Sequence, residues 1–267
     1  MRIKVSLKDA EDKVLLEQMQ DDITVLVFKK RYQLGDYYEI ELEKPNSYIV
    51  VQLDPILNPA LIYIHGKHWR YNIPFNFQRY PAMADGSFGG IAHYAYVREA
   101  TTEEILREQN LAYNSHDQHQ NSGAFPHVTA NAETRNEDAF LAKNVIDGYL
   151  ANKGHGRFPF QSWGIDQRDD AELKLDFGRE VLVKKIGILL RADFPHDNYW
   201  TKADITFSDG ATITLNLEKT DKIQYFSVAK KKSSYLKLNH LCKAADGNDA
   251  FPSLSQLLVW GTNKIQF

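Results

Sequence analysis

The chain of 267 residues has one cysteine, Cys242, and therefore cannot form an internal disulfide. It has no run of the ~20 apolar residues that a membrane-spanning helix needs. Its first residues, MRIKVSLKDAEDK, carry charges where a secretory signal requires an unbroken apolar stretch. The net charge of −3 provides no general attraction to nucleic acid or to an anionic membrane. We therefore expect a cytoplasmic protein that binds neither nucleic acid nor membrane, with export by another route left open.

Motifs of common catalytic sites are also missing from the sequence. It contains no Gly-x-Ser-x-Gly elbow, no His-Glu-x-x-His pair and no glycine-rich phosphate loop ahead of a helix. The carboxylate pairs Asp21-Asp22 and Asp169-Asp170 are typical of exposed turns. A glycosidase needs two carboxylates facing each other across a cleft, which a sequence cannot show. We therefore expect a non-catalytic protein, with an enzyme as the alternative.

Short apolar stretches in the first half of the chain predict β-strands. They alternate with turn signals such as Gly35-Asp36, Pro45-Asn46 and Asn58-Pro59. The stretches are IKVSL, DITVLVF, DYYEIEL, SYIVVQL and ALIYIH. Because no helical pattern lies between them, they favour antiparallel sheets packed as a sandwich or a barrel.

Two short helices are predicted beside the strands. Thr101 and Glu104 have the spacing of a capping box, in which hydroxyl and carboxylate each satisfy a free backbone N–H. This box predicts a helix from about Thr102 to Gln109. A second short helix is predicted over Glu137 to Lys143, with Asn136 able to cap it.

A polar segment divides the chain into two parts. The segment NSHDQHQNSGAFP, with glycine and proline near its end, is typical of a linker between domains. We place one domain over residues 1–121 and the other over residues 122–267. The second part resumes a β pattern in AELKLDFG, VLVKKIGILLR, KADITFSD, TITLNL, KIQYFSVA, SYLKLN and LSQLLVWG. The sequence therefore predicts an all-β fold of two β-sandwich domains.

The second part also contains motifs in a recognisable order. They are AKNVIDG (142–148), Trp163 within FQSWGID, AELKLDFGREVLVKKIGILLR (171–191), ADITFSDG and LSQLLVWG. In this order and spacing they resemble a discoidin-type domain (coagulation factor 5/8 type C). Such domains belong to the galactose-binding-like superfamily, which includes many bacterial carbohydrate-binding modules. The resemblance implies a jelly-roll sandwich, with ligand held by the loops at one end.

Two loops correspond to the ligand-binding end of such domains, residues 152–163 and residues 191–200. Together they offer aromatic faces for the C–H face of a pyranose and polar groups for its hydroxyls. The predicted glycan-binding residues are His155, Arg157, Phe158, Phe160, Trp163, Arg191, His196, Asp197 and Trp200. In the alternative, structural interpretation, both tryptophans pack in the core, and Arg191 forms an ion pair with Asp193 or Asp197.

The turn at Asp147-Gly148 is the predicted cation site. The resemblance implies a structural calcium ion held by the Asp147 carboxylate and backbone carbonyls, which are oxygen ligands that suit a hard cation. This chain has Gln256 where the family often has a glutamate, and the alternative is that Asp147 only caps its own turn. The pairs His65/His68 and His116/His119 are candidates for a transition metal, which needs three or four converging ligands.

These observations favour a non-catalytic protein that binds a carbohydrate or glycan through the end loops of its second domain. One alternative is a carbohydrate-active enzyme, or an accessory fragment of one, with its cleft between the domains. Another is a scaffold for protein–protein contacts. The aromatic segment HWRYNIPFNFQRYP (68–81) is either a second recognition surface or part of the interdomain contact. The sequence leaves the sugar and the oligomeric state open.

Overall fold

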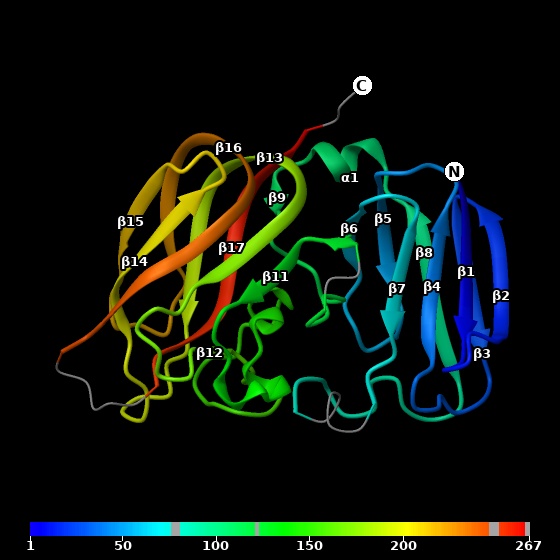
Figure 1. The fold of residues 1–267 in the computed structure, drawn as a ribbon, viewed down its shortest axis with the longest axis horizontal. Helices are drawn as coiled ribbons and strands as arrows, with labels where there is room; N and C mark the ends of the chain where they lie inside the picture. Colours follow the sequence, from blue (N-terminus) through cyan, green and yellow to red (C-terminus); the bar gives the residue numbers. More distant parts are fainter. Residues whose placement is uncertain (76–80, 121–122, 246–250, 265–267) are drawn as a thin grey trace.

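The computed structural model describes residues 1–75, 81–120, 123–245 and 251–264. These residues fold almost entirely into antiparallel β-sheets (Figure 1). The predicted all-β fold is confirmed. A first sandwich forms the right-hand side of this view, and a second forms the left. No helix in the described ranges is long and apolar enough to span a bilayer.

The first sandwich consists of two facing sheets. One has the order β2 (Val14–Asp21), β1 (Arg2–Lys8), β4 (Tyr37–Leu42) and β7 (His68–Asn72). The other has the order β10 (Ala124–Phe125), β6 (Ala60–Ile64), β5 (Ser47–Gln52), β8 (His93–Glu99) and β3 (Ile23–Phe28). Alternate side chains of these strands point inward and form one core, to which Ile3, Ile40 and Ile49 belong.

The predicted strands of the first half correspond to β1, β3, β4, β5 and β6. The strands β2, β7 and β8 were not predicted. Almost all of β2 is exposed, so its sequence lacks the alternation of a half-buried strand. In β7, Trp69 and Tyr71 are buried in the first core, which gives part of the aromatic segment 68–81 a structural role. Residues 76–80 of that segment lie outside the described residues.

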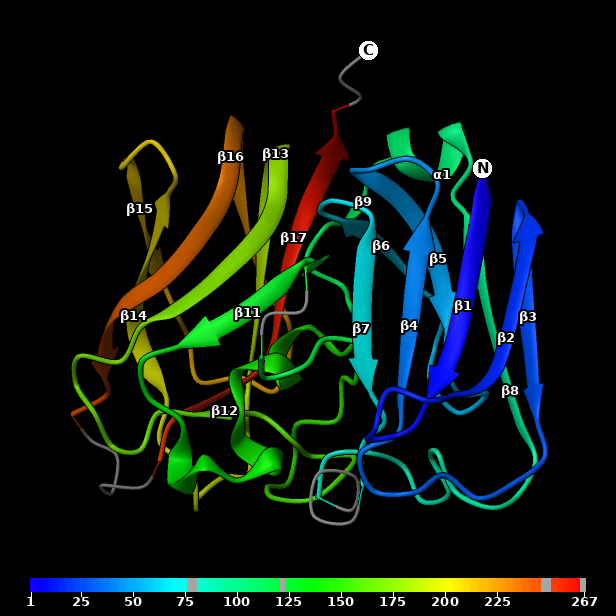
Figure 2. The same cartoon turned by 45° about the vertical axis from the view of Figure 1, so that its right-hand side comes forward.

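The second sandwich is one eight-stranded sheet that curves around its own core (Figure 2). Its order is β12 (Trp163–Gly164), β17 (Ser253–Asn263), β13 (Leu173–Leu190), β16 (Gln224–Lys243), β14 (Trp200–Phe207) and β15 (Thr212–Asn216). Two further strands complete the eight: β11 (His127–Ala130) pairs with β13, and β9 (Gln109–Asn110) pairs with β17. The long strand β13 lies between β16 and β17, the central position that its apolar sequence favours.

Two predicted strands on either side of Gly178 form the single strand β13. The pairing register shifts between Asp176 and Val181, and Gly178 lies within this bend at φ 67°. A Cβ atom at Gly178 would lie 2.4 Å from the ring of Phe125, so both conformation and space require glycine here. The bend allows one strand to pass from one side of the core to the other.

The predicted linker is not an exposed connection. The two-residue strand β9 (Gln109–Asn110) pairs with β17 of the second sandwich, whereas β10 pairs with β6 of the first. Between them, Asn114 and His116 are both 1% exposed, because the chain passes through the junction of the sandwiches. Residues 121 and 122, where we placed the boundary, lie outside the described residues. The division at this point stays a prediction.

One predicted helix is present and the other is not. The helix α1 (Thr102–Leu106) begins with the predicted capping box of Thr101 and Glu104, and it ends early because Gln109 enters β9. The helix predicted over Glu137 to Lys143 is wrong. Three short 3₁₀ turns stand there: η2 (Thr134–Asn136), η3 (Asp138–Phe140) and η4 (Ala142–Ile146). Glu137 and Leu141 between the turns have extended backbones, which interrupts helical hydrogen bonding.

Candidate functional site

The two loops predicted to bind glycan meet at one end of the second sandwich. The Ala192 N–H donates to the Asn152 carbonyl at 2.7 Å. His155 Nδ1 lies 2.6 Å from Asp193 Oδ2, and the rings of His155 and His196 stack with centroids 4.4 Å apart. A cavity of about 160 Å³, here called the loop-end cavity, opens at this place. It is lined by Thr134, Arg135, Phe140, His155, Arg191, His196, Phe251 and Ser253.

Arg191 is a buried charged residue in the lining of the loop-end cavity. Its guanidinium forms a forked ion pair with Asp197, with Nε to Oδ2 at 2.9 Å and Nη2 to Oδ1 at 2.7 Å. Nη2 also donates to the Phe251 carbonyl at 3.0 Å. The Asp193 N–H donates to Asp197 Oδ2 at 2.9 Å, so the same carboxylate holds the loop in shape. Within the described part of the chain Nη1 finds no acceptor, which leaves its two N–H groups for a ligand.

The structure divides the predicted glycan-binding residues into separate groups. His155, Arg191 and His196 line the loop-end cavity. Asp197 lies behind Arg191 with a fully buried carboxylate, and therefore positions it, as the alternative interpretation of this pair predicts.

The predicted roles of Trp163 and Trp200 in ligand binding are wrong. Their exposed fractions are 0% and 1%, and their ring centroids lie 6.3 Å apart inside the second core. Trp163 donates its indole N–H to the Ala132 carbonyl at 2.8 Å. Because both rings are buried in this core, neither can stack on a sugar.

Arg157 and Phe158 are not part of the loop-end cavity either. The Phe158 N–H donates to the Pro81 carbonyl at 2.8 Å, and its ring meets Tyr149 edge-on at 5.0 Å. The Arg157 side chain is exposed but does not line the cavity. Phe160, in the same loop, packs its ring against Gly154, 3.1 Å from where a Cβ would stand.

Sequence reasoning missed Arg135 and Phe251, which line the cavity instead. Phe251 is 38% exposed, and Arg135 lies over the Phe140 ring with 5.4 Å between guanidinium carbon and ring centroid. Phe251 lies two residues before the start of β17, and Arg135 lies in η2, so both are outside the two loops in sequence. One signal in the sequence could have indicated Phe251. The last strand, β17, runs antiparallel to β13, so residues just before β17 lie at the same end of the sheet as the loop that follows β13.

Asp147 accepts hydrogen bonds from three donors. The Tyr149 N–H donates to Oδ1 at 2.9 Å, the Gln161 amide to Oδ2 at 2.8 Å, and the Gln256 amide to Oδ1 at 2.7 Å. Gln256 Nε2 also donates to the Asn144 carbonyl at 2.8 Å. Burial raises the pKa of Asp147 to about 7, although these three hydrogen bonds act against the shift.

These residues do not fit a calcium ion. Calcium takes six to eight oxygen ligands. Here both Asp147 oxygens and the Asn144 carbonyl are taken by amide hydrogens, and Gln256 places nitrogen where the cation would need oxygen. The Gln256 carbonyl is also occupied, because it accepts from the Gly148 N–H at 3.1 Å. The turn is therefore joined to β17 by a glutamine amide.

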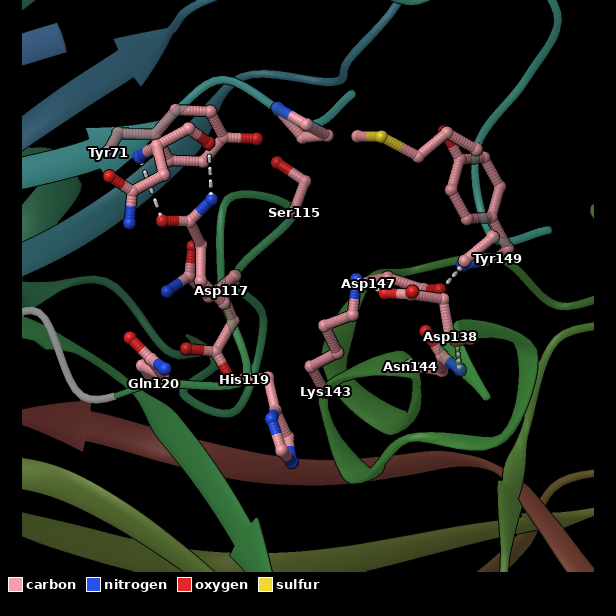
Figure 3. A pocket seen from close by; sticks show the side chains of 16 residues that line it. Tyr71, Ser115, Asp117, His119, Gln120, Asp138, Lys143, Asn144, Asp147 and Tyr149 are labelled. Atoms are coloured by element: carbon pink, nitrogen blue, oxygen red, sulfur yellow. Dashed lines mark hydrogen bonds and ion pairs between the residues drawn. The ribbon is translucent and has the colours of Figure 1, made fainter. Parts of the chain in front are cut away.

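A second cavity, of about 230 Å³, lies at the junction of the two sandwiches and is here called the junction cavity (Figure 3). Its lining comes from β7, from residues 114–120 and from the segment that contains η3 and η4. Figure 3 shows Lys143 between Ser115 on one side and Tyr149 on the other. Lys143 Nζ lies 3.5 Å from Asp138 Oδ1, and Asp147 also lines the cavity. Acidic and basic groups therefore face a common space.

The histidine pairs predicted from spacing do not form metal sites in the described residues. His116 is 1% exposed; its Nε2 accepts from the Leu53 N–H at 3.1 Å, and Nδ1 bonds Ser115 Oγ at 2.9 Å. Burial lowers the pKa of His116 to about 3, so the ring is neutral and structural. Its predicted partner His119 instead pairs with Glu133 at 2.7 Å. His65 and His68 are exposed and belong to no group of three converging ligands in the part described.

Comparison with protein families finds no family model that matches the chain. No curated protein matches it by sequence.

Several solved structures have a similar fold over about half of the chain or somewhat more. A family 32 carbohydrate-binding module from C. perfringens, solved with galactose, is 19% identical over 50% of this chain and 91% of its own, with a TM-score of 0.38. The lectin domain of lectinolysin, complexed with Lewis B antigen, is 14% identical over 58% and 98%, with a TM-score of 0.44. A fucose-binding module from Streptococcus pneumoniae is 14% identical over 61% and 99%, with a TM-score of 0.42. At these scores the likeness carries no argument about ligand or site.

Proposed function

We propose that this protein binds a glycan in the loop-end cavity. The observation that supports the proposal is the state of Arg191, a lining residue of the cavity that is 3% exposed and locked by Asp197, while its Nη1 has no acceptor among the described residues. Burying a guanidinium is costly, and one carboxylate satisfies only part of its donor set. A sugar hydroxyl is an acceptor of the right size and polarity for the remaining N–H groups.

The other walls of the cavity complete a sugar-binding set. Phe251 presents an exposed aromatic ring for the C–H face of a pyranose. His155, His196 and Arg135 supply polar groups that can donate or accept hydrogen bonds with hydroxyls. The cavity, about 160 Å³, is smaller than the ~300–1,000 Å³ of most small-molecule sites, which favours one terminal sugar over a long chain. We expect weak binding, with a Kd between about 1 mM and 1 μM.

A glycan array followed by calorimetry on the full chain tests the proposal. We expect Phe251→Ala and Arg135→Ala each to weaken binding by about tenfold, which equals about 1.4 kcal/mol. Tyr94→Ala is the matched control for the aromatic ring, because Tyr94 is 41% exposed on β8 of the other sandwich. Arg157→Ala is the matched control for the charge, since Arg157 is exposed outside the cavity.

If all four variants bind the glycan as tightly as the unaltered protein does, the loop-end cavity is excluded as the site. Loss of affinity in Arg157→Ala but not in Arg135→Ala would move the site to the outer side of the loop. Arg191→Ala is unsuitable as a binding test, because it leaves the buried Asp197 without its partner and endangers the fold.

A carbohydrate-active enzyme is the second candidate, and the junction cavity favours it. A general acid needs a carboxyl group that stays protonated near neutral pH, and burial raises the pKa of Asp147 to about 7. Asp117 also lines this cavity, as does Asp138, which is held by Lys143. Turnover of a panel of nitrophenyl glycosides that is abolished in Asp147→Asn would support this function. A complete lack of turnover across the panel would count against it.

A further inference from the structure

Two histidines and an aspartate converge at the mouth of the loop-end cavity. His155, Asp193 and His196 each offer one ligand atom, and these atoms lie within 4.8 Å of one another. No other group of three such residues in the described ranges comes as close together. The histidines come from different loops, so no spacing motif in the sequence indicates them.

We propose that His155, Asp193 and His196 bind a zinc ion. Two imidazoles and one carboxylate are the ligand set of zinc sites that keep an open fourth position. Imidazole nitrogen favours zinc over calcium or magnesium, which prefer an all-oxygen shell. This inference does not depend on the glycan proposal, because it rests on the ligand set alone.

Both histidines are already oriented by carboxylates. His196 Nδ1 lies 3.2 Å from Asp197 Oδ1, and Asp197 is fixed in turn by Arg191. A zinc-binding histidine usually donates its other ring N–H to such a carboxylate, which leaves Nε2 free for the ion. His155 Nδ1 lies 2.6 Å from Asp193 Oδ2, and a zinc ion bound by both residues would replace this hydrogen bond. Asp193 is 30% exposed, so its carboxylate can turn toward the ion.

Binding requires a rotation of the two rings. They now stack with centroids 4.4 Å apart and planes 6° from parallel. A zinc ion lies in the plane of each imidazole that binds it, and two parallel planes share no point. The side chains of His155 and His196 are 46% and 48% exposed, so both rings can tilt without disturbing the core.

Calorimetric titration of the full chain with zinc chloride, in a non-chelating buffer and without any sugar, tests the site. We expect one zinc ion per chain. His196→Ala and Asp193→Asn should each weaken binding at least tenfold, because even the loss of a residue that only hydrogen-bonds to a metal ligand costs about 10–100-fold. His240→Ala is the matched control, because His240 is also an exposed imidazole bonded to a carboxylate, Asp204, at 3.0 Å. This control should bind zinc as the unaltered protein does.

No zinc binding, or binding that is unchanged in both His196→Ala and Asp193→Asn, would overturn the proposal. Circular dichroism of each variant separates loss of the ligand from loss of the fold, and Asp193→Asn keeps the size of the side chain. Zinc binding in a protein that binds no glycan would uphold this inference while rejecting the proposed function. Glycan binding that persists in EDTA, with no zinc bound under any condition, would uphold the proposed function and reject the zinc site.

Discussion

Acid should weaken this protein through the buried imidazole of His116. The ring lies at the junction of the sandwiches, where Nε2 accepts from the Leu53 N–H and Nδ1 bonds Ser115 Oγ. A proton on Nε2 would break the hydrogen bond with the Leu53 N–H. It would also leave a buried positive charge on the ring, and neither hydrogen-bond partner of the ring is a carboxylate. Burial accordingly lowers the pKa of His116 from 6.5 to about 3.

The size of the effect follows from proton linkage. Between pH 6.5 and about pH 3 the unfolded chain binds a proton at His116 that the folded chain does not, so stability falls as the pH falls. Each pH unit in this window removes about 1.4 kcal/mol from the free energy of unfolding. The loss is about 2 kcal/mol at pH 5, and above pH 6.5 the stabilisation is complete.

Urea unfolding at pH 8 and at pH 5 measures this loss. We expect the free energy of unfolding to fall between the two pH values by about 2 kcal/mol more in the unaltered protein than in His116→Gln. The glutamine oxygen can accept from the Leu53 N–H, and the side chain does not titrate. His65→Gln is the control, since it removes an exposed histidine from the first sandwich. If His116→Gln loses as much stability as the unaltered protein between pH 8 and pH 5, the buried, neutral state of His116 is refuted.

Other consequences concern the Asp147 turn and the Arg191 pair. Burial raises the pKa of Asp147 to about 7, so its contribution to the free energy of unfolding falls by about 4 kcal/mol as the pH rises from about 4 to 7. Urea unfolding of Asp147→Asn should no longer show this pH dependence. Calcium chloride added to the metal-free protein should leave the melting temperature unchanged, whereas Gln256→Glu should lower the melting temperature at neutral pH and make it rise again with calcium. Arg191→Ala should cost about 3–5 kcal/mol in urea unfolding, because Asp197 keeps a buried charge without a partner.

Each of these expectations has an outcome that contradicts it. Asp169→Asn, at an exposed carboxylate, should leave the pH dependence of the free energy of unfolding unchanged. If Asp147→Asn and Asp169→Asn alter this pH dependence equally, Asp147 is not its source. A melting temperature of the unaltered, metal-free protein that rises when calcium chloride is added would restore the predicted calcium site. A loss below about 1 kcal/mol in Arg191→Ala would mean that the pair behaves as an exposed one.

Sequence alone determined the class of the fold and much of its local structure. Alternation of apolar and polar residues is a local property, so it located β1, β4 and β5 without knowledge of their partners. The capping box of α1 and the glycine at the bend of β13 are local for the same reason. Where local signals were weak, as in exposed β2 or in the three 3₁₀ turns, prediction missed the element or gave it the wrong type.

The tertiary structure decided which side chains of the end loops face a ligand. Trp163 and Trp200 are of a residue type that sugar sites use, but both are buried in the second core. Phe251, which the sequence did not indicate, is exposed and lines the same cavity as Arg191. The same is true of His155 and His196, which no motif connects and which meet only when two loops close on one end of the sheet. Burial and convergence depend on which segments pack together, and that information is spread over the whole chain.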